Sequence, residues 1–145
     1  MIKQYKISVP KNTLNNIYKK IRNYPWNMIQ HVNGWEYGTN YNFLKKISQY
    51  WVSKYDWKKF ENKINSFKNY KTNVDGINLH FIKEKSKNPK SRPLLLLHGW
   101  PGSVIEFFDI IPKLAHPEKF GGKIEDGFDV IVPSLPGFGF STPIK

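Results

Sequence analysis

The sequence of 145 residues contains no cysteine, so a disulfide-stabilised scaffold and a zinc site with cysteine ligands are excluded. It has no apolar run that approaches the ~20 residues of a membrane-spanning helix, and residues 1–6 include no apolar signal core. These absences predict a cytoplasmic chain without a membrane segment. Hydrophobic residues still make up 39% of the sequence and aromatic residues 16%, which excludes a disordered chain.

Arginine is scarce, with 2 Arg beside 21 Lys and 14 Asn. The formal net charge of +12 would by itself suggest a nucleic acid or an anionic membrane as partner. Proteins that read phosphates and bases depend on the bidentate fork of arginine, however. The charge is also uneven, because residues 1–92 hold 19 basic and 5 acidic side chains, whereas residues 93–145 hold 4 and 6. We therefore predict no nucleic-acid partner.

Apolar residues recur at helical spacing in the first 69 residues. Residues 13–22, 41–54 and 57–67 each place their apolar side chains on one face of a helix, and Asp56 is the expected N-cap of the third. Residues 28–39 have two glycines and no periodicity, and are predicted to form an extended loop. We interpret the aromatic residues of these helices as packing between helices, not as a ligand-binding box.

The period of the pattern changes after residue 69. Residues 70–74 and 77–82 alternate in polarity around Asp75-Gly76, a dipeptide that favours the positive φ angles of a tight hairpin turn. Residues 94–97 are four consecutive leucines. Such an aliphatic run predicts a strand that is buried on both faces, as in a parallel sheet.

A strand–helix–strand unit completes the pattern. A helix is predicted over residues 103–114, where Ser103 and Glu106 have capping-box spacing, and a second buried strand over residues 128–132. Parallel strands joined by a helix form a right-handed crossover. The sequence therefore predicts an α/β fold in which N-terminal helices precede a hairpin and a parallel strand–helix–strand unit.

The loop that follows the leucine strand is the first candidate for chemistry, because sites in parallel sheets lie beyond the carboxyl ends of the strands. Gly99 lets the backbone turn after the strand, and Pro101 has no N–H, so Trp100 is the expected backbone donor to a developing oxyanion. The alternative is a plain strand-to-helix turn with Trp100 packed in the core. His98 is interpreted as a structural residue that braces this loop by hydrogen bonds.

The second candidate loop covers residues 136–141 and contains Gly137-Phe138-Gly139. A dinucleotide fingerprint needs a further glycine where Thr142 stands, so we predict no such cofactor. Neither a cofactor nor a metal site is predicted elsewhere. The expected role of this loop is a tight lip, with Phe138 and Phe140 lining an apolar pocket.

Residues 94–103, which contain His98-Gly99-Trp100-Pro101, and residues 132–141 together resemble the epoxide hydrolases of the α/β-hydrolase superfamily. Residues 34–38, 50–57 and 74–81 resemble the N-terminal segment of the microsomal type. The resemblance implies an N-terminal region of helices and a hairpin over residues 1–92. It also implies the beginning of a catalytic domain over residues 93–145.

The resemblance implies the addition of water to a small apolar epoxide. In that family an Asp carboxylate on a nucleophile elbow opens the ring to give an alkyl-enzyme ester, while two cap tyrosines polarise the epoxide oxygen. A His with an acidic partner then activates the water that releases a diol. The Trp100 amide would form part of the oxyanion hole, with His98, Gly99 and Pro101 supporting the loop, and Trp100–Pro101 would be a cis peptide.

The sequence departs from the family in lacking the elbow, since it has no Gly-x-Asp-x-Gly turn. The cap, the catalytic His and its acidic partner are missing too, as is the membrane anchor of animal members. We therefore expect a truncated N-terminal portion that is inactive alone, with the leucine strand at an aggregation-prone sheet edge. Two alternatives stay open: a non-catalytic interaction module, and a fragment of an esterase or haloalkane dehalogenase.

Overall fold

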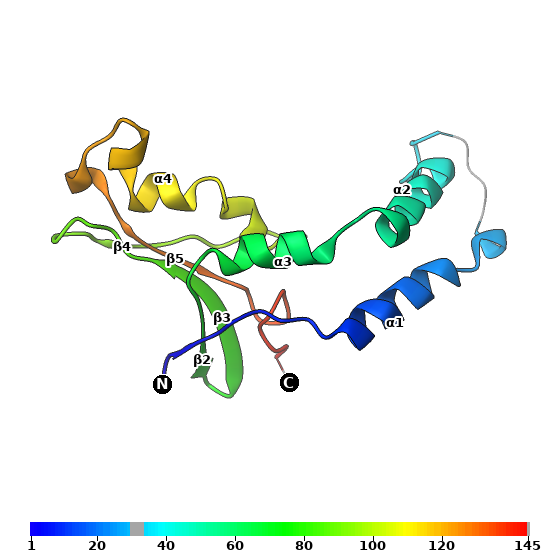
Figure 1. The fold of residues 1–145 in the computed structure, drawn as a ribbon, viewed down its shortest axis with the longest axis horizontal. Coiled ribbons are helices and arrows are strands. Elements are labelled where there is room, and N and C mark those ends of the chain that lie inside the picture. Colours follow the sequence, from blue (N-terminus) through cyan, green and yellow to red (C-terminus); the bar gives the residue numbers. More distant parts are fainter. Residues whose placement is uncertain (30–33, 145) are drawn as a thin grey trace. The chain divides into compact units, whose positions relative to one another are not determined.

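A computed structural model describes residues 1–29 and 34–144, which form two compact units (Figure 1). The helical unit comprises residues 8–60, and the sheet unit comprises residues 1–7 together with 61–144. No helix within these described ranges combines the length and apolar character needed to cross a membrane. The domain division expected between residues 92 and 93 stays a prediction.

The helical unit holds α1 (Lys11–Arg22), α2 (Tyr41–Ser53) and the start of α3 (Trp57–Asn65). All three helices were predicted, and α1 and α2 pack against each other. The Asn40 side chain caps α2 by accepting a 3.1 Å hydrogen bond from the Phe43 N–H. Part of the loop predicted over residues 28–39 lies outside the described residues. Residues 29 and 34–39 form neither helix nor strand, whereas Met28 ends a 3-10 helix, η1 (Trp26–Met28), which was not predicted.

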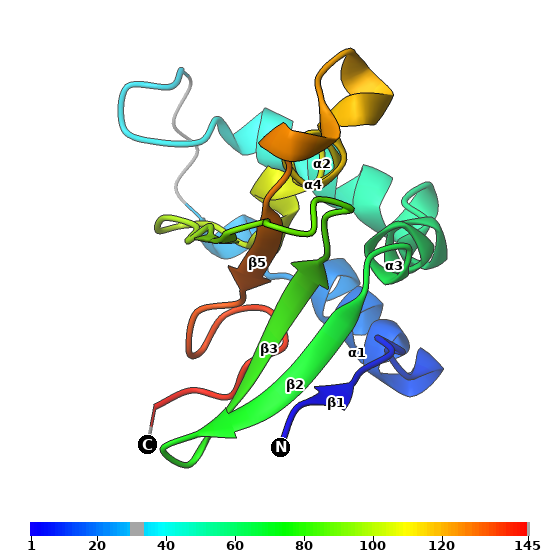
Figure 2. The same ribbon diagram turned by 90° about the vertical axis from the view of Figure 1, so that its left-hand side faces the viewer.

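The sheet unit is built on five strands in the order β1-β2-β3-β5-β4 (Figure 2). Their bounds are β1 Lys3–Gln4, β2 Asn69–Val74, β3 Ile77–Glu84, β4 Pro93–Leu95 and β5 Asp129–Pro133. Strands β4 and β5 pair in parallel, and every other pair is antiparallel. The predicted α/β class, the hairpin, the parallel pair and the position of the leucine strand at one edge are confirmed. The short strand β1 was not predicted.

The hairpin turn shows how local chemistry fixes this register. Asp75 and Gly76 have φ angles of 49° and 84°, the positive values expected of a tight two-residue turn. The turn sets Val74 opposite Ile77, and the pairing continues to Asn69 opposite Ile82.

The prediction that the leucine strand is buried on both faces is wrong. Leu94 and Leu96 are half-buried, but Leu95 and Leu97 are each 57% exposed. The reason is that β4 is an edge strand, and no element of the described ranges covers the face that Leu95 and Leu97 share. Four aliphatic residues in a row therefore indicated a strand correctly but not what lies on either side of it.

The single helix predicted over residues 103–114 is also wrong, because the segment forms two short helices. A 3-10 helix, η2 (Val104–Phe107), is followed by a turn and then by α4 (Ile111–Ala115). Pro112 has no N–H to continue a helical hydrogen-bond ladder, but it is tolerated in a first turn, so the helix starts again there. The capping box of Ser103 and Glu106 is confirmed at the start of η2.

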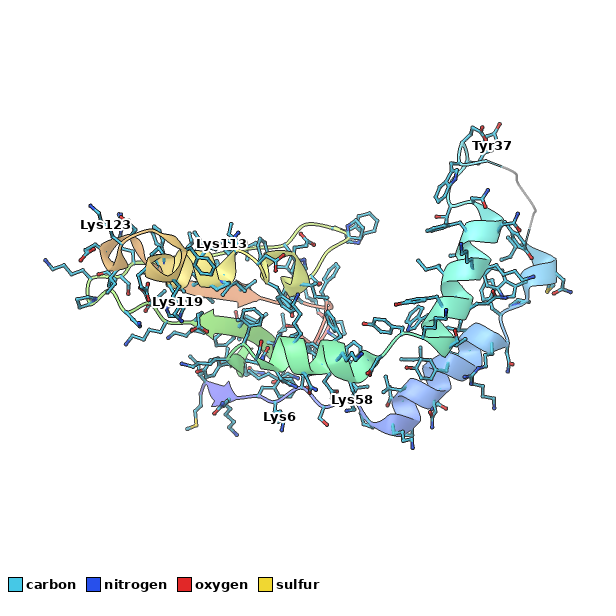
Figure 3. All side chains as sticks on the ribbon, turned by 45° about the horizontal axis from the view of Figure 1, so that its top comes forward. Lys6, Tyr37, Lys58, Lys113, Lys119 and Lys123 are labelled. Carbon is cyan, nitrogen blue, oxygen red and sulfur yellow. The ribbon has the colours of Figure 1, made fainter. Side chains whose placement is uncertain are left out.

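The short helices cover one face of the sheet. Helix α4 packs against β3 and β5. The largest fully buried aliphatic side chains of the core come from these elements, from α3 and from the segment after β1: Ile7, Ile64, Ile82, Ile111, Val130 and Val132. The lysines Lys113, Lys119 and Lys123 extend outward into solvent from this covering segment (Figure 3). The parallel strands β4 and β5 end at the same edge of the sheet, and both candidate loops begin there.

Candidate active-site loops

Two loops lie beyond the carboxyl ends of the parallel strands. Residues 96–103 follow β4, and residues 134–142 follow β5. Because β4 and β5 run in the same direction, both loops leave the sheet at the same edge. This is the position that the sequence predicted for both.

The first loop presents a free backbone donor. Residues 96–103 belong to neither helix nor strand, and in the part of the chain that the structure describes the Trp100 N–H donates no hydrogen bond. The Trp100–Pro101 peptide is cis, as the resemblance implied. The Trp100 side chain is 85% exposed, so the alternative in which it packs in the core is wrong. A peptide N–H left open at a strand end can stabilise negative charge on an oxygen atom.

His98 connects the two loops. Its side chain is buried, and its Nε2 accepts a 3.1 Å hydrogen bond from the Leu135 N–H. Since Nε2 accepts, the ring proton is on Nδ1, which donates to the Gly99 carbonyl at 3.0 Å. The Phe138 ring packs edge-on against the imidazole, with 5.3 Å between ring centroids. One side chain therefore contacts the backbone of both loops.

The second loop folds back onto β3. The Thr142 N–H donates to the Asn78 carbonyl at 3.1 Å, and the Thr142 hydroxyl oxygen accepts from the Asn78 N–H at 3.0 Å. Phe138 and Phe140 are half-buried, and Phe140 packs edge-on against His80 with 5.3 Å between ring centroids. Their predicted role as a pocket lip stays a prediction.

A buried polar network around His80, which no pattern in the sequence predicted, ties this loop to the hairpin. His80 Nδ1 lies 2.8 Å from Ser134 Oγ, and its Nε2 lies 3.0 Å from Asn69 Oδ1. Burial, and secondarily the charge of Lys71, lower the pKa of His80 from its ordinary value of 6.5 to about 4. Alternation along 77–82 placed His80 on a strand, but only the fold brings residues 69, 80 and 134 together.

The helical unit contains an apolar groove of about 560 Å³. It is lined by side chains of the two predicted apolar stripes and their neighbours: Val9, Leu14, Ile17, Tyr18, Ile47, Tyr50, Trp51, Tyr55 and Trp57. The groove holds no catalytic group beyond the tyrosine hydroxyls. Across residues 1–29 and 34–144, no group of three or more His, Asp or Glu side chains is gathered to hold a metal ion.

Both the helical N-terminal region and the segment with the two loops match known protein families. Residues 2–107 match the family described as epoxide hydrolase N terminus, and residues 92–145 match the α/β hydrolase fold. A relative from Stigmatella aurantiaca that carries the epoxide hydrolase name is 44% identical over 140 residues, which cover 97% of this chain and 32% of that protein. Epoxide hydrolase 1 of Oryctolagus cuniculus is 39% identical over 146 residues, with coverages of 97% and 32%.

A solved structure agrees with the sequence matches. The crystal structure of juvenile hormone epoxide hydrolase from the silkworm Bombyx mori is similar with a TM-score of 0.83 and 33% identity. The similarity covers 99% of this chain and 34% of the silkworm chain. The chain thus spans about a third of the length of the curated relatives that it matches.

Proposed function

Since the chain belongs to the epoxide hydrolase family, we propose that it contributes the N-terminal part of a catalytic unit that adds water to an epoxide and yields a vicinal diol. The observation that carries this proposal is the open Trp100 N–H at the end of a parallel strand. In the proposed reaction, a carboxylate opens the epoxide to give an ester, and water then attacks the ester carbonyl.

The Trp100 amide acts in the second of these steps. As water adds to the ester carbonyl and gives up a proton to a base, the carbonyl oxygen takes on negative charge. A backbone N–H already aimed at that oxygen stabilises the charge without reorganising. Pro101 has no N–H, and we assign the role of donor to the Trp100 N–H that precedes it in this turn.

No Gly-x-Asp-x-Gly turn occurs in the sequence. We therefore assign the carboxylate nucleophile, the base and its acidic partner to the rest of the catalytic unit and not to this chain. We therefore expect the chain to show no turnover by itself. Phe138 and Phe140 are proposed to border the site on the apolar side of the epoxide, which suits a substrate with an apolar substituent. The free amide and the apolar rings together favour a small apolar epoxide.

Complementation tests this function. The chain is mixed with the separately produced remaining two thirds of the Stigmatella aurantiaca relative, and conversion of styrene oxide to its diol is measured. Each part alone is expected to be inactive, and the mixture active. The variant Trp100→Pro, which removes the amide hydrogen, is expected to lower kcat in the mixture by about 10²–10³. A stable complex of the two parts without diol formation would contradict the proposal.

A further inference from the structure

We infer that His80 is a positioning residue: its neutral imidazole clamps the loop of residues 134–142 onto β2 and β3, and so fixes Phe138 against His98. The clamp itself is independent of any reaction. Its consequence for catalysis rests on the proposed function, because the clamped loop carries Phe138 and Phe140, the rings proposed to border the substrate.

The tautomer of His80 follows from its neighbours. Both hydrogens of the Asn69 side-chain amide donate to carbonyl oxygens, those of Ile64 at 2.9 Å and Phe67 at 2.8 Å. Asn69 therefore turns its Oδ1 toward His80, and this oxygen can only accept, so the ring proton is on Nε2. Nδ1 is left to accept a hydrogen bond from the Ser134 hydroxyl.

The backbone of the same residue holds both ends of the loop. The His80 N–H donates to Ser141 Oγ at 2.9 Å, and the Ser141 hydroxyl donates to the Ser134 carbonyl at 2.7 Å. The Ser134 N–H donates to the His80 carbonyl at 2.9 Å. All three residues are buried, so each of these bonds is shielded from water. Ser134 and Ser141, which lie at or next to the two ends of the loop, are thereby tied to one residue of β3.

The loop transmits this constraint to His98. Between its tied ends it carries the Leu135 N–H and the Phe138 ring, both of which contact the His98 imidazole. Gly139, at a φ of 52°, leaves space for Ser134, because a Cβ there would lie 2.8 Å from the Ser134 hydroxyl oxygen. A side chain at position 139 would push the hydroxyl away from His80.

The surroundings of His80 favour the neutral ring. Tyr5 packs edge-on against it with 6.0 Å between centroids, and Phe140 packs on it at 5.3 Å. The charged group that faces this cluster is Lys71, whose Nζ lies 4.1 Å from the centre of the Tyr5 ring. The polar groups that contact the imidazole, from Asn69 and Ser134, are uncharged. An imidazolium here would lack a carboxylate partner among the described contacts.

Amide hydrogen exchange measured by NMR on the full chain tests the clamp. His80→Gln is expected to raise exchange about tenfold or more at Leu135, Phe138, Ser141 and Thr142, while the amides that pair β4 with β5 keep their protection. The matched control is His116→Gln, since His116 is a half-buried histidine of the same unit whose Nε2 also has a side-chain partner, Glu84 at 3.0 Å. Its effect should be confined to the neighbourhood of Glu84 and Glu118.

A second variant and the nitrogen shifts of the His80 ring test the inference independently of His80→Gln. If His80→Gln does not fold, Ser134→Ala removes only the hydroxyl, and it must still raise exchange in residues 135–142. The nitrogen shifts of the His80 ring at pH 7 must show protonation on Nε2. Protonation on Nδ1, unchanged exchange in Ser134→Ala, or a uniform loss of protection across the whole sheet would each overturn the inference.

The complementation assay separates this inference from the proposed function. In the active mixture, His80→Gln is expected to raise KM for styrene oxide more than it lowers kcat, because the displaced loop carries the apolar rings and not the amide. If the wild-type mixture is inactive but local exchange responds as expected, the function fails and the clamp stands. If the mixture is active and exchange at residues 135–142 does not respond, the clamp fails.

Discussion

The two units of this chain bury their apolar residues to very different degrees. In the sheet unit Ile7, Ile64, Ile82 and Ile111 are 0–1% exposed. In the helical unit, Tyr41 is the one buried hydrophobic residue among residues 8–29 and 34–60, and 9% of its surface is exposed. The apolar residues of α2 are half-exposed instead: Phe43, Leu44, Ile47, Tyr50 and Trp51. An amphipathic pattern thus specifies which face is apolar without specifying what covers it.

The units differ in their polar groups as well. Side chains that are buried in the sheet unit, such as those of His80, Asn69 and His98, have hydrogen-bond partners far away in the sequence. The side-chain hydrogen bonds of the helical unit are mostly local: the Asn40 amide oxygen accepts at a cap, and the Ser48 hydroxyl donates within a turn. The Tyr41 hydroxyl reaches further and donates to the Trp26 carbonyl. Long-range polar contacts in a dry interior define one conformation, so loops of defined shape are expected in the sheet unit.

The largest expected effect is a cavity in the sheet unit. Ile82→Ala removes methylene and methyl groups from a side chain that is 0% exposed, and should lower the free energy of unfolding by about 2–5 kcal/mol. Urea denaturation of the two proteins measures the difference. The control Leu95→Ala, at a side chain that is 57% exposed, should cost much less. Equal losses would mean that the face of β4 is covered in solution.

Acid should destabilise the sheet unit through His80. Because its pKa is about 4 in the folded state and near 6.5 in the unfolded chain, the unfolded state binds more protons between these values. Stability is therefore complete above pH 6.5 and falls as the pH drops toward 4, by about 3 kcal/mol in total. Thermal unfolding at a series of pH values measures this loss.

The variant His80→Gln isolates that effect, since it should unfold with little pH dependence between pH 6.5 and 5. Asp129 affects stability in another pH range. Burial acts to raise the pKa of Asp129, but hydrogen bonds from Ser91 and Ser86, together with the charges of Lys85 and Lys83, outweigh this and lower it below 3.8. Stability from this carboxylate is present above pH 3.8 and is lost only below it. An unchanged slope in His80→Gln would contradict the assignment to His80.

Much of this fold could be predicted from the sequence, because the deciding interactions are local. The Asp75-Gly76 turn, the Ser103 capping box and the apolar faces of α1 and α2 each depend on residues within a few positions. The predictions that were wrong depended on where an element lies in the folded sheet. Leu95 and Leu97 are exposed because β4 is an edge strand, which a run of four leucines does not reveal.

In the candidate site, too, local features could be predicted and long-range contacts could not. The Trp100 turn could be predicted because Gly99 and Pro101 constrain the backbone on either side of it. The contact between His98 and Leu135, and that between His80 and Ser134, join residues 37 and 54 positions apart. A lone His in a strand gives no signal for such a partner. A signal existed only in the pair of glycines around Phe138, which indicated a tight loop.

A smaller effect is expected at the start of α2 in the helical unit. Asn40→Ala removes the oxygen that accepts from the Phe43 N–H and should destabilise the helix by about 1 kcal/mol. Amide exchange in residues 41–44 measures the loss. Asn40→Ser restores an acceptor and should recover most of the protection. Spread of the effect to β2 and β3 would show that the two units unfold together, whereas confinement to α2 would show that the helical unit opens by itself.

The smallest effect is expected on the exposed face of α2. Ile47 lines the apolar groove yet is 47% exposed, and glutamine has a higher helix propensity than isoleucine, so Ile47→Gln should change the free energy of unfolding by less than about 0.5 kcal/mol. The same substitution at Ile64, in α3 and 1% exposed, buries an amide and should cost several times more. Urea denaturation compares the two. A loss above about 1 kcal/mol in Ile47→Gln would mean that this face is buried in solution, because burial is the property that separates two isoleucines on otherwise similar helices.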